Sequence, residues 1–215
     1  MAISKVQDPL YIYEGDASVT LSFPNTPTAG NLMIALGRSG TNSYTNGSID
    51  GWELATGVQT GTASHMGLWY KVAGAAESKD VTLDWTDSVD TMLIIEEWTG
   101  LSAAPLDQIS SYYAAGTVTS RTSGTTPTTA VADELCLAGF AMGSTISAES
   151  WSNSFVLEKR NSTTPKFLLG SLIVASTGTY ETTLSWTTAR TSGGLIATFK
   201  GITVSVWIPK VIMVM

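Results

Sequence analysis

Two stretches of the chain share one pattern of apolar, glycine and polar positions. Residues 81–101 read VTLDWTDSVDTMLIIEEWTGL, and residues 182–202 read TTLSWTTARTSGGLIATFKGI. They align without a gap, so that Trp85 falls on Trp186. The apolar residues and glycines match, whereas nearly every polar residue differs. This pattern predicts a repeated scaffold rather than a repeated active site.

The chain upstream of each copy is also repeated. Residues 31–35 (NLMIA) resemble residues 134–138 (ELCLA), and the order and spacing of the apolar runs hold. We therefore predict an internal duplication of about 100 residues, with halves at 18–101 and 126–202 and a crossover at 102–125.

Short apolar or alternating runs bounded by Gly, Pro and Asn predict β-strands. Residues 18–23 (SVTLSF) alternate polar and apolar side chains, as a half-buried strand does. Residues 31–37 are apolar on both faces, which favours a buried central strand. The other strands expected in this half begin at Trp52 or cover residues 10–13, 66–73, 81–85 and 92–99.

Two arrangements would bury these strands. Each half could form its own small sandwich, or both could supply strands to one jelly roll, which is itself two Greek keys. We favour the single jelly roll over residues 18–202, because each half has few clear strands and its apolar strand needs cover on both faces. The predicted fold is all-β: an antiparallel β-sandwich of jelly-roll type built from two internally repeated halves.

The connection between the halves differs in composition. Residues 102–111 allow one helical turn after Pro105, and residues 117–129 are nearly all Thr, Ser and Gly. A linker and an edge strand both fit this composition, and we favour an ordered crossover.

Two segments lie outside the repeat, an N-terminal arm (1–17) and an apolar C-terminal arm (203–215). The second contains Pro209 and is shorter than the roughly 20 residues of a transmembrane helix. It is either an extra strand on its own domain or an arm that docks on a neighbouring subunit by strand addition, and we favour docking. The candidate interface residues are Tyr11, Tyr13, Val204, Val206, Trp207, Ile208, Val211, Ile212 and Val214.

Composition narrows the function classes. Apolar residues make up 43% of the 215, which is more than a disordered chain carries. The net charge is −7 and no Lys/Arg cluster is present, so we expect no nucleic-acid partner. We expect the single cysteine, Cys136, to be a buried apolar residue. The N-terminus lacks the apolar segment of a signal peptide, so we expect assembly in a cytoplasm and no membrane partner.

The sequence offers little catalytic chemistry. His65 is the only histidine and enters a strand without a nucleophile motif nearby. Asp84, Asp87 and Asp90 could hold Ca²⁺, but the repeat carries Ser and Thr at these places, which favours a solvated acidic loop. We expect no cofactor and no metal.

Two adjacent acids also bear on catalysis. Glu96 and Glu97 lie in one strand and point to opposite faces, so they cannot form a glycosidase pair with each other. A glycan hydrolase would need a pairing with a distant acid that the sequence does not reveal. We therefore expect a protein that is not an enzyme.

The aromatic residues have two interpretations. They could form a sugar-stacking platform, but repetition at scaffold positions favours the core. These residues are Trp52, Trp69, Tyr70, Trp85, Trp98, Trp151 and Trp186. Tyr44, Tyr112 and Tyr113 are better candidates for surface contacts.

Four motifs carry a resemblance to a known family. They are FPxxPTAGNL at 23–32, WYKVA at 69–73, EWTGL at 97–101 and TTPTT at 125–129. Together they resemble jelly-roll accessory proteins of tailed bacteriophage virions, over most of residues 18–202. These motifs belong to the framework, so the resemblance implies no catalytic residues.

The resemblance implies a structural role. Members of such families serve as capsid cement (decoration) proteins or as tail and fibre components. We expect a virion protein, assembled in the host cytoplasm, that bridges major capsid subunits or contacts other virion proteins. We expect it to be a homo-oligomer, namely a trimer. The alternative is a receptor- or carbohydrate-binding module of a tail fibre or tail tip.

Overall fold

A computed structural model describes residues 2–40, 47–60, 65–86, 90–162 and 166–202. All regular structure in these ranges is β-strand, and they contain no helix able to cross a membrane. From here on, the first half means the strands before Gly100 and the second half those after it, which differs from the bounds expected from the sequence. The strands of the first half are β1 (Ser4–Glu14), β2 (Ser18–Ser22), β3 (Leu32–Ser39), β4 (Ser48–Ile49), β5 (Glu53–Gln59), β6 (His65–Val72), β7 (Asp80–Asp84) and β8 (Thr91–Thr99). Those of the second half are β9 (Leu101–Tyr113), β10 (Val118–Thr122), β11 (Glu134–Met142), β12 (Ser150–Trp151), β13 (Val156–Arg160), β14 (Phe167–Val174), β15 (Thr183–Arg190) and β16 (Ser192–Gly201).

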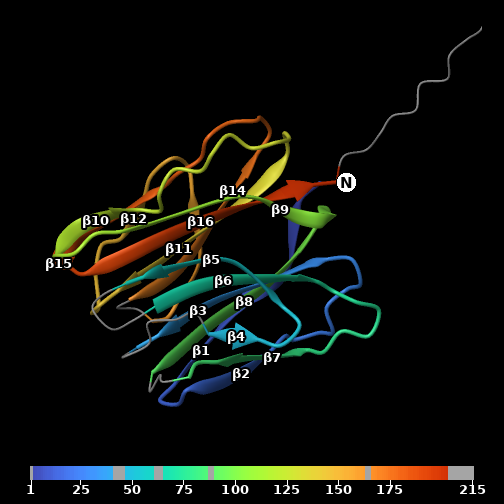
Figure 1. Cartoon of the computed structure of the whole chain (residues 1–215), viewed down its shortest axis with the longest axis horizontal. Coiled ribbons are helices and arrows are strands. Elements are labelled where there is room, and N and C mark those ends of the chain that lie inside the picture. The colour runs from blue at the N-terminus through green and yellow to red at the C-terminus, as the bar shows by residue number, and fades with distance from the viewer. Residues whose placement is uncertain (1, 41–46, 61–64, 87–89, 163–165, 203–215) are drawn as a thin grey trace, which may run out of the picture.

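The described strands form antiparallel sheets stacked in layers (Figure 1). A five-stranded sheet of order β1-β8-β3-β6-β5 packs against a second one of order β13-β14-β11-β16-β9. A three-stranded sheet covers the outer face of each, β2-β7-β4 on the first and β10-β15-β12 on the second. The all-β, antiparallel, sandwich-like architecture predicted from the sequence is therefore present.

Hydrophobic cores fill the spaces between these layers. The central core lies between the five-stranded sheets and includes Ile34 and Leu36 of β3 with Leu137 of β11. Each outer core lies between a five-stranded sheet and its three-stranded sheet. Successive residues of β3 alternate between the central core and an outer one. This strand is thus buried on both faces, as predicted.

The two halves share a core but no sheet. Every ladder among the described strands joins strands of the same half, whereas the arrangement we favoured from the sequence mixes strands of both. The difference has a physical reason. The strands β3 and β11 obtain cover on one face from the small sheet of their own half and on the other face from the other half.

Two segments expected outside regular structure are strands. Residues 4–14, predicted as part of an N-terminal arm, form β1 and pair with β8 from Ser4 to Glu14. The helical turn predicted after Pro105 is wrong, because this residue lies within β9. β9 is an edge strand with an irregular register, where a proline is tolerated. Residues 102–125, expected as an ordered crossover, contain most of β9 and all of β10, which pair with β16 and β15 of the second half.

The edges of the large sheets are interrupted. Each of the edge strands β1, β5, β9 and β13 has a register irregularity in its pairing. Such bulges twist a strand and break the continuous row of free backbone groups that another strand would need. These edges are therefore poor templates for strand addition.

Candidate functional site

Both described chain ends lie at one end of the sheets, which we call the terminal end. The Ile202 N–H donates to the Gly100 carbonyl oxygen at 2.9 Å. A side chain at Gly100 would collide with the Ala2 carbonyl oxygen, so Ala2 also lies against this glycine. Figure 1 shows the N-terminus beside the end of β16. An attachment through both chain ends would thus use a single face.

Exposed apolar side chains gather at the terminal end. Val156 is 58% exposed and Ile173 is 49% exposed. They lie on the same face of the sheet, because Val156 pairs with Ser171, two residues before Ile173. Val6, near the start of β1, and Ile202, just after β16, are each 44% exposed and lie at the same end of the sheets. We call these four residues the terminal apolar set.

An ion pair joins the two halves near the terminal apolar set. The Lys5 ammonium of β1 contacts the Glu158 carboxylate of β13, which also accepts a hydrogen bond from the Ser171 hydroxyl. The Glu158 side chain is largely buried, and the Lys5 side chain is partly exposed. This contact fixes the two sheet edges relative to each other.

A cavity of about 370 Å³ lies at the opposite end of the molecule, between β1 and the residues just after β13 and just before β14. We call it the Tyr11–Lys166 cavity. Its lining residues are Tyr11, Tyr13, Met92, Asn161, Ser162 and Lys166. The Tyr13 hydroxyl donates to Asp90 Oδ1 at 2.6 Å, and the Lys166 Nζ lies 6.0 Å from the Tyr13 ring centroid. The structure thus brings the predicted Tyr11 and Tyr13 together in one site.

A buried arginine lies behind this cavity. Arg38, at the end of β3, is 3% exposed, and its Nη1 lies 3.7 Å from the Sδ of Met92 in the cavity wall. Its Nε has no hydrogen-bond partner among the described residues. Burial lowers the pKa of Arg38 to about 10, so it remains charged at neutral pH. Burial and the charge of Arg38 both lower the pKa of Lys166.

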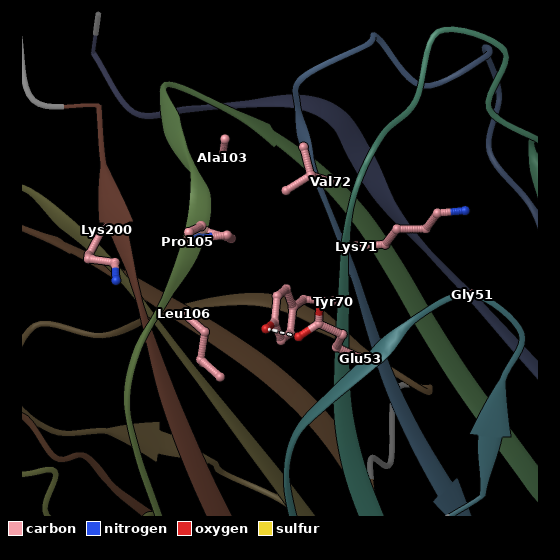
Figure 2. Close-up of a pocket in the computed structure, with 10 residues that line it drawn as sticks. Gly51, Glu53, Tyr70, Lys71, Val72, Ala103, Pro105, Leu106 and Lys200 are labelled. Carbon is pink, nitrogen blue, oxygen red and sulfur yellow. Dashed lines mark hydrogen bonds between the residues drawn. The ribbon is translucent and has the colours of Figure 1, made fainter.

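A second cavity, of about 470 Å³, lies between β5 and β6 on one side and β9 on the other (Figure 2). The Tyr70 hydroxyl donates to Glu53 Oε2 at 2.5 Å, and this pair faces Pro105 and Leu106. Burial, followed by the bond to Glu53, raises the pKa of Tyr70 to about 12. The Lys71 ammonium points away and binds Glu77 at 2.8 Å. Among the described residues of this cavity, Glu53 is an acid held by a hydrogen bond, and no nucleophilic side chain is paired with a base.

Glu96 and Glu97 point to opposite faces of β8, as predicted. Glu97 accepts hydrogen bonds from the Asn31 side chain at 2.6 Å and from the Thr28 N–H at 2.8 Å. Glu96 faces the central core, and its pKa is raised to about 8, mainly by burial and in smaller part by the charge of Glu158. Among the described residues, no donor is placed well enough to form a hydrogen bond with the Glu96 oxygens. The nearby Trp98 indole nevertheless lowers the pKa of Glu96. Because Glu96 is fully enclosed, a substrate cannot reach it in this structure.

A second buried acid lies in the second half, near the same end of the sheets as Glu96. Glu134 is the first residue of β11 and is fully buried. Its pKa is raised to about 7, mainly by burial; the hydrogen bond with Thr198 lowers the pKa and the neighbouring Asp107 raises it.

The remaining predicted residues fall into three groups. The core assignment of the tryptophans is confirmed for Trp69, Trp85, Trp98 and Trp186, which are buried, while Trp52 and Trp151 pack against the outer cores. Cys136 is buried, as predicted. Tyr112 is exposed beneath the Arg121 guanidinium, and Tyr113 packs against the central core.

Several predicted residues lie outside the described part of the chain. They are Tyr44, Asp87, Val204, Val206, Trp207, Ile208, Val211, Ile212 and Val214. Among the described residues, no three His, Cys, Asp or Glu side chains come together as a metal site would require. His65 is half-buried, and burial lowers its pKa.

Sequence reasoning missed Arg38, Asn161 and Lys166. One signal for Arg38 was available: it is a cation directly after the apolar run of residues 32–37, where a strand buried on both faces is expected. Asn161 and Lys166 gave no signal, because only the packing of the second half on β1 brings them to Tyr11.

Comparisons of this chain with protein-family models, with curated proteins and with solved structures found no match.

Proposed function

We propose that this chain is a non-enzymatic structural protein of a tailed-bacteriophage virion, namely a capsid cement or decoration protein that bridges subunits of the major capsid protein. The motifs of residues 23–32 and 97–101, which resemble phage accessory proteins, first suggest this role. The observation that carries the proposal is the strand order of the sheets.

The order of the first half recurs eight strands later. β1-β8-β3-β6-β5 with β2-β7-β4 becomes β9-β16-β11-β14-β13 with β10-β15-β12. In a jelly roll the first, eighth, third and sixth strands form one sheet, and the second, seventh and fourth lie in the other. Here β5 pairs with β6 and so joins the first sheet. We infer two jelly rolls that arose by duplication, and this fold is typical of viral capsid and lectin domains.

The terminal apolar set supplies the docking surface in this proposal. The interrupted edges of β1, β5, β9 and β13 disfavour strand addition there, so apolar side chains carry the contact. Residues 203–215 follow directly on Ile202 and would extend this contact. The partner is the major capsid protein or another virion protein, and the bound form is a homo-oligomer, which we propose to be a trimer.

The test is rebinding to particles stripped of the chain. Val156→Asp/Ile173→Asp places two charges in the terminal apolar set, and a second variant lacks residues 203–215. Both variants should fold, as judged by circular dichroism, and should lose most of their binding. Leu54→Asp, a change of comparable exposure on β5, is the matched control and should bind fully. Full binding by both test variants would refute the proposal.

A lectin-like role in a tail fibre is the second candidate. The Tyr11–Lys166 cavity favours it, because aromatic and cationic side chains line a recess of ligand size.

A further inference from the structure

The Tyr11–Lys166 cavity collects hydrogen-bond donors in a chain whose net charge is −7. The Asn161 Oδ1 accepts the backbone N–H groups of Lys166 at 2.7 Å and Phe167 at 2.9 Å. Its NH₂ group is therefore left to donate on the Tyr11 side, where its hydrogen bond acts on Tyr11. The Lys166 ammonium adds further donors to the same wall.

The described residues around this cavity carry more positive than negative charge. Arg38 and Lys166 are close enough to lower the pKa of Lys166 through repulsion. Asp90 is the carboxylate that acts on both cations, and its Oδ1 is held by the Tyr13 hydroxyl. Among the described residues, one acid therefore faces two partly desolvated cations, and this local excess of positive charge stabilises an anion.

The fold does not require a cation here. In β3 the cross-strand pair at this place is Arg38 with Met92, and in β11 the corresponding pair is Ala141 with Gly193. The second half thus builds the same strand end with small residues that contact the core without charge. Burial of an arginine whose Nε has no partner among the described residues is costly. A bound anion would offset that cost and so gives a reason for an arginine at this place.

We propose that the Tyr11–Lys166 cavity binds an anionic sugar, a pyranose that carries a carboxylate or a phosphate group. Lys166 and Arg38 would hold the anionic group, with Met92 shifting to admit it. Asn161 and the tyrosine hydroxyls would bind ring hydroxyls, and the tyrosine rings would flank the sugar. The volume of about 370 Å³ suits a ligand of this size. This inference rests on the lectin-like second candidate, for which it names the ligand class, and it uses the end of the molecule opposite the proposed capsid contact.

The test is titration of the full chain with glucuronate, glucose 6-phosphate, glucose and inorganic phosphate, followed by calorimetry and by NMR of the isotope-labelled protein. At least one anionic sugar should bind saturably, about tenfold or more tighter than glucose and inorganic phosphate, because a hydrogen bond to a charged group contributes that much. Lys166→Met and Arg38→Met should each weaken binding by a similar factor. Lys200→Met, beside the other cavity, should leave it unchanged.

Three results would overturn the proposal. They are equal binding of glucose and the anionic sugars, equal binding of inorganic phosphate and the anionic sugars, and unchanged binding by a folded Lys166→Met variant. Lys166 is only partly buried, so its variant remains informative if Arg38→Met fails to fold. The capsid-rebinding result is independent, because its variants lie at the terminal end.

Discussion

The Lys166 ammonium lies 6.0 Å from the centre of the Tyr13 ring, and the two residues belong to opposite halves of the chain. At the terminal end the cation comes from the first half instead, where Lys5 contacts Glu158 of the second half. Strand β1 is therefore held against the second half by one cation from each side. This strand is a tie between the halves as well as a sheet edge.

We expect Lys5→Met to destabilise the protein by about 1–3 kcal/mol, because it leaves the largely buried Glu158 without its cation. Urea unfolding at pH 7 measures the loss. The double variant Lys5→Met/Glu158→Gln should recover much of it, since no buried charge remains. Exposed Lys79→Met is the control and should stay within about 0.5 kcal/mol of the parent. Equal stability of Lys5→Met and Lys79→Met would argue against the tie.

Glu96 should make the protein less stable as pH rises. Burial raises its pKa to about 8 from 4.5, so the folded state keeps a proton that the unfolded chain releases between these values. The free energy of unfolding then falls with rising pH across that window, by at most about 1.4 kcal/mol per pH unit. Glu96→Gln removes this term. Relative to the parent, the variant should gain stability between pH 5 and pH 8.5 in urea unfolding.

A carboxylate of opposite behaviour provides the control for this pH series. Burial would raise the pKa of Glu77, but hydrogen bonds from the Gly74 N–H and from Lys71 lower it overall. Its stabilisation is present above the unfolded pKa and is lost as pH falls through the folded value. Glu77→Gln should therefore cost stability at neutral pH and cost little in acid. Parallel pH profiles for the two variants would contradict both assignments.

Gly67 should not tolerate a side chain. An added Cβ would lie 2.5 Å from the Trp69 ring in an outer core. We expect Gly67→Ala to lower the free energy of unfolding by about 1–3 kcal/mol through overpacking. Gly74→Ala, whose Cβ would meet only the Glu77 carboxylate at 3.6 Å, should change it little. Thermal unfolding compares the two, and equal melting temperatures would mean that Trp69 is packed more loosely than the structure has it.

The first half should not exist as a folded monomer. Residues 1–100 alone would expose Ile34, Leu36 and the other central-core residues of their five-stranded sheet. Such a surface is expected to associate or to lose its packing. Near-ultraviolet circular dichroism and light scattering should report a dimer, an aggregate or a loosely packed chain. A well-folded monomer would show that the shared core is dispensable.

The local pattern was enough to predict the strands but not their layers. β3 and β11 were predictable because runs of apolar residues bounded by turns imply burial on both faces. A sheet from either half could cover each apolar face equally well. The pattern therefore does not determine which sheet packs on which face of these strands. β9 was missed because Pro105 argues against a central strand while being compatible with an edge.

The cavity was less predictable than the fold. Tyr11 and Tyr13 were singled out for their place near the chain end, whereas their neighbours Asn161 and Lys166 come from the other half. No periodicity relates residues that meet only when two sheets stack. Among the residues at this site, only Arg38 stands out in the sequence, because it is a charged residue within an apolar strand.

The position of Gly100 makes the order of the halves along the chain interchangeable. This single residue connects β8 to β9, and both Ala2 and Ile202 lie against it. A short linker between residues 202 and 2, with new termini opened at residue 100, would yield a circular permutant that preserves every layer. In such a molecule the second half would be synthesised first.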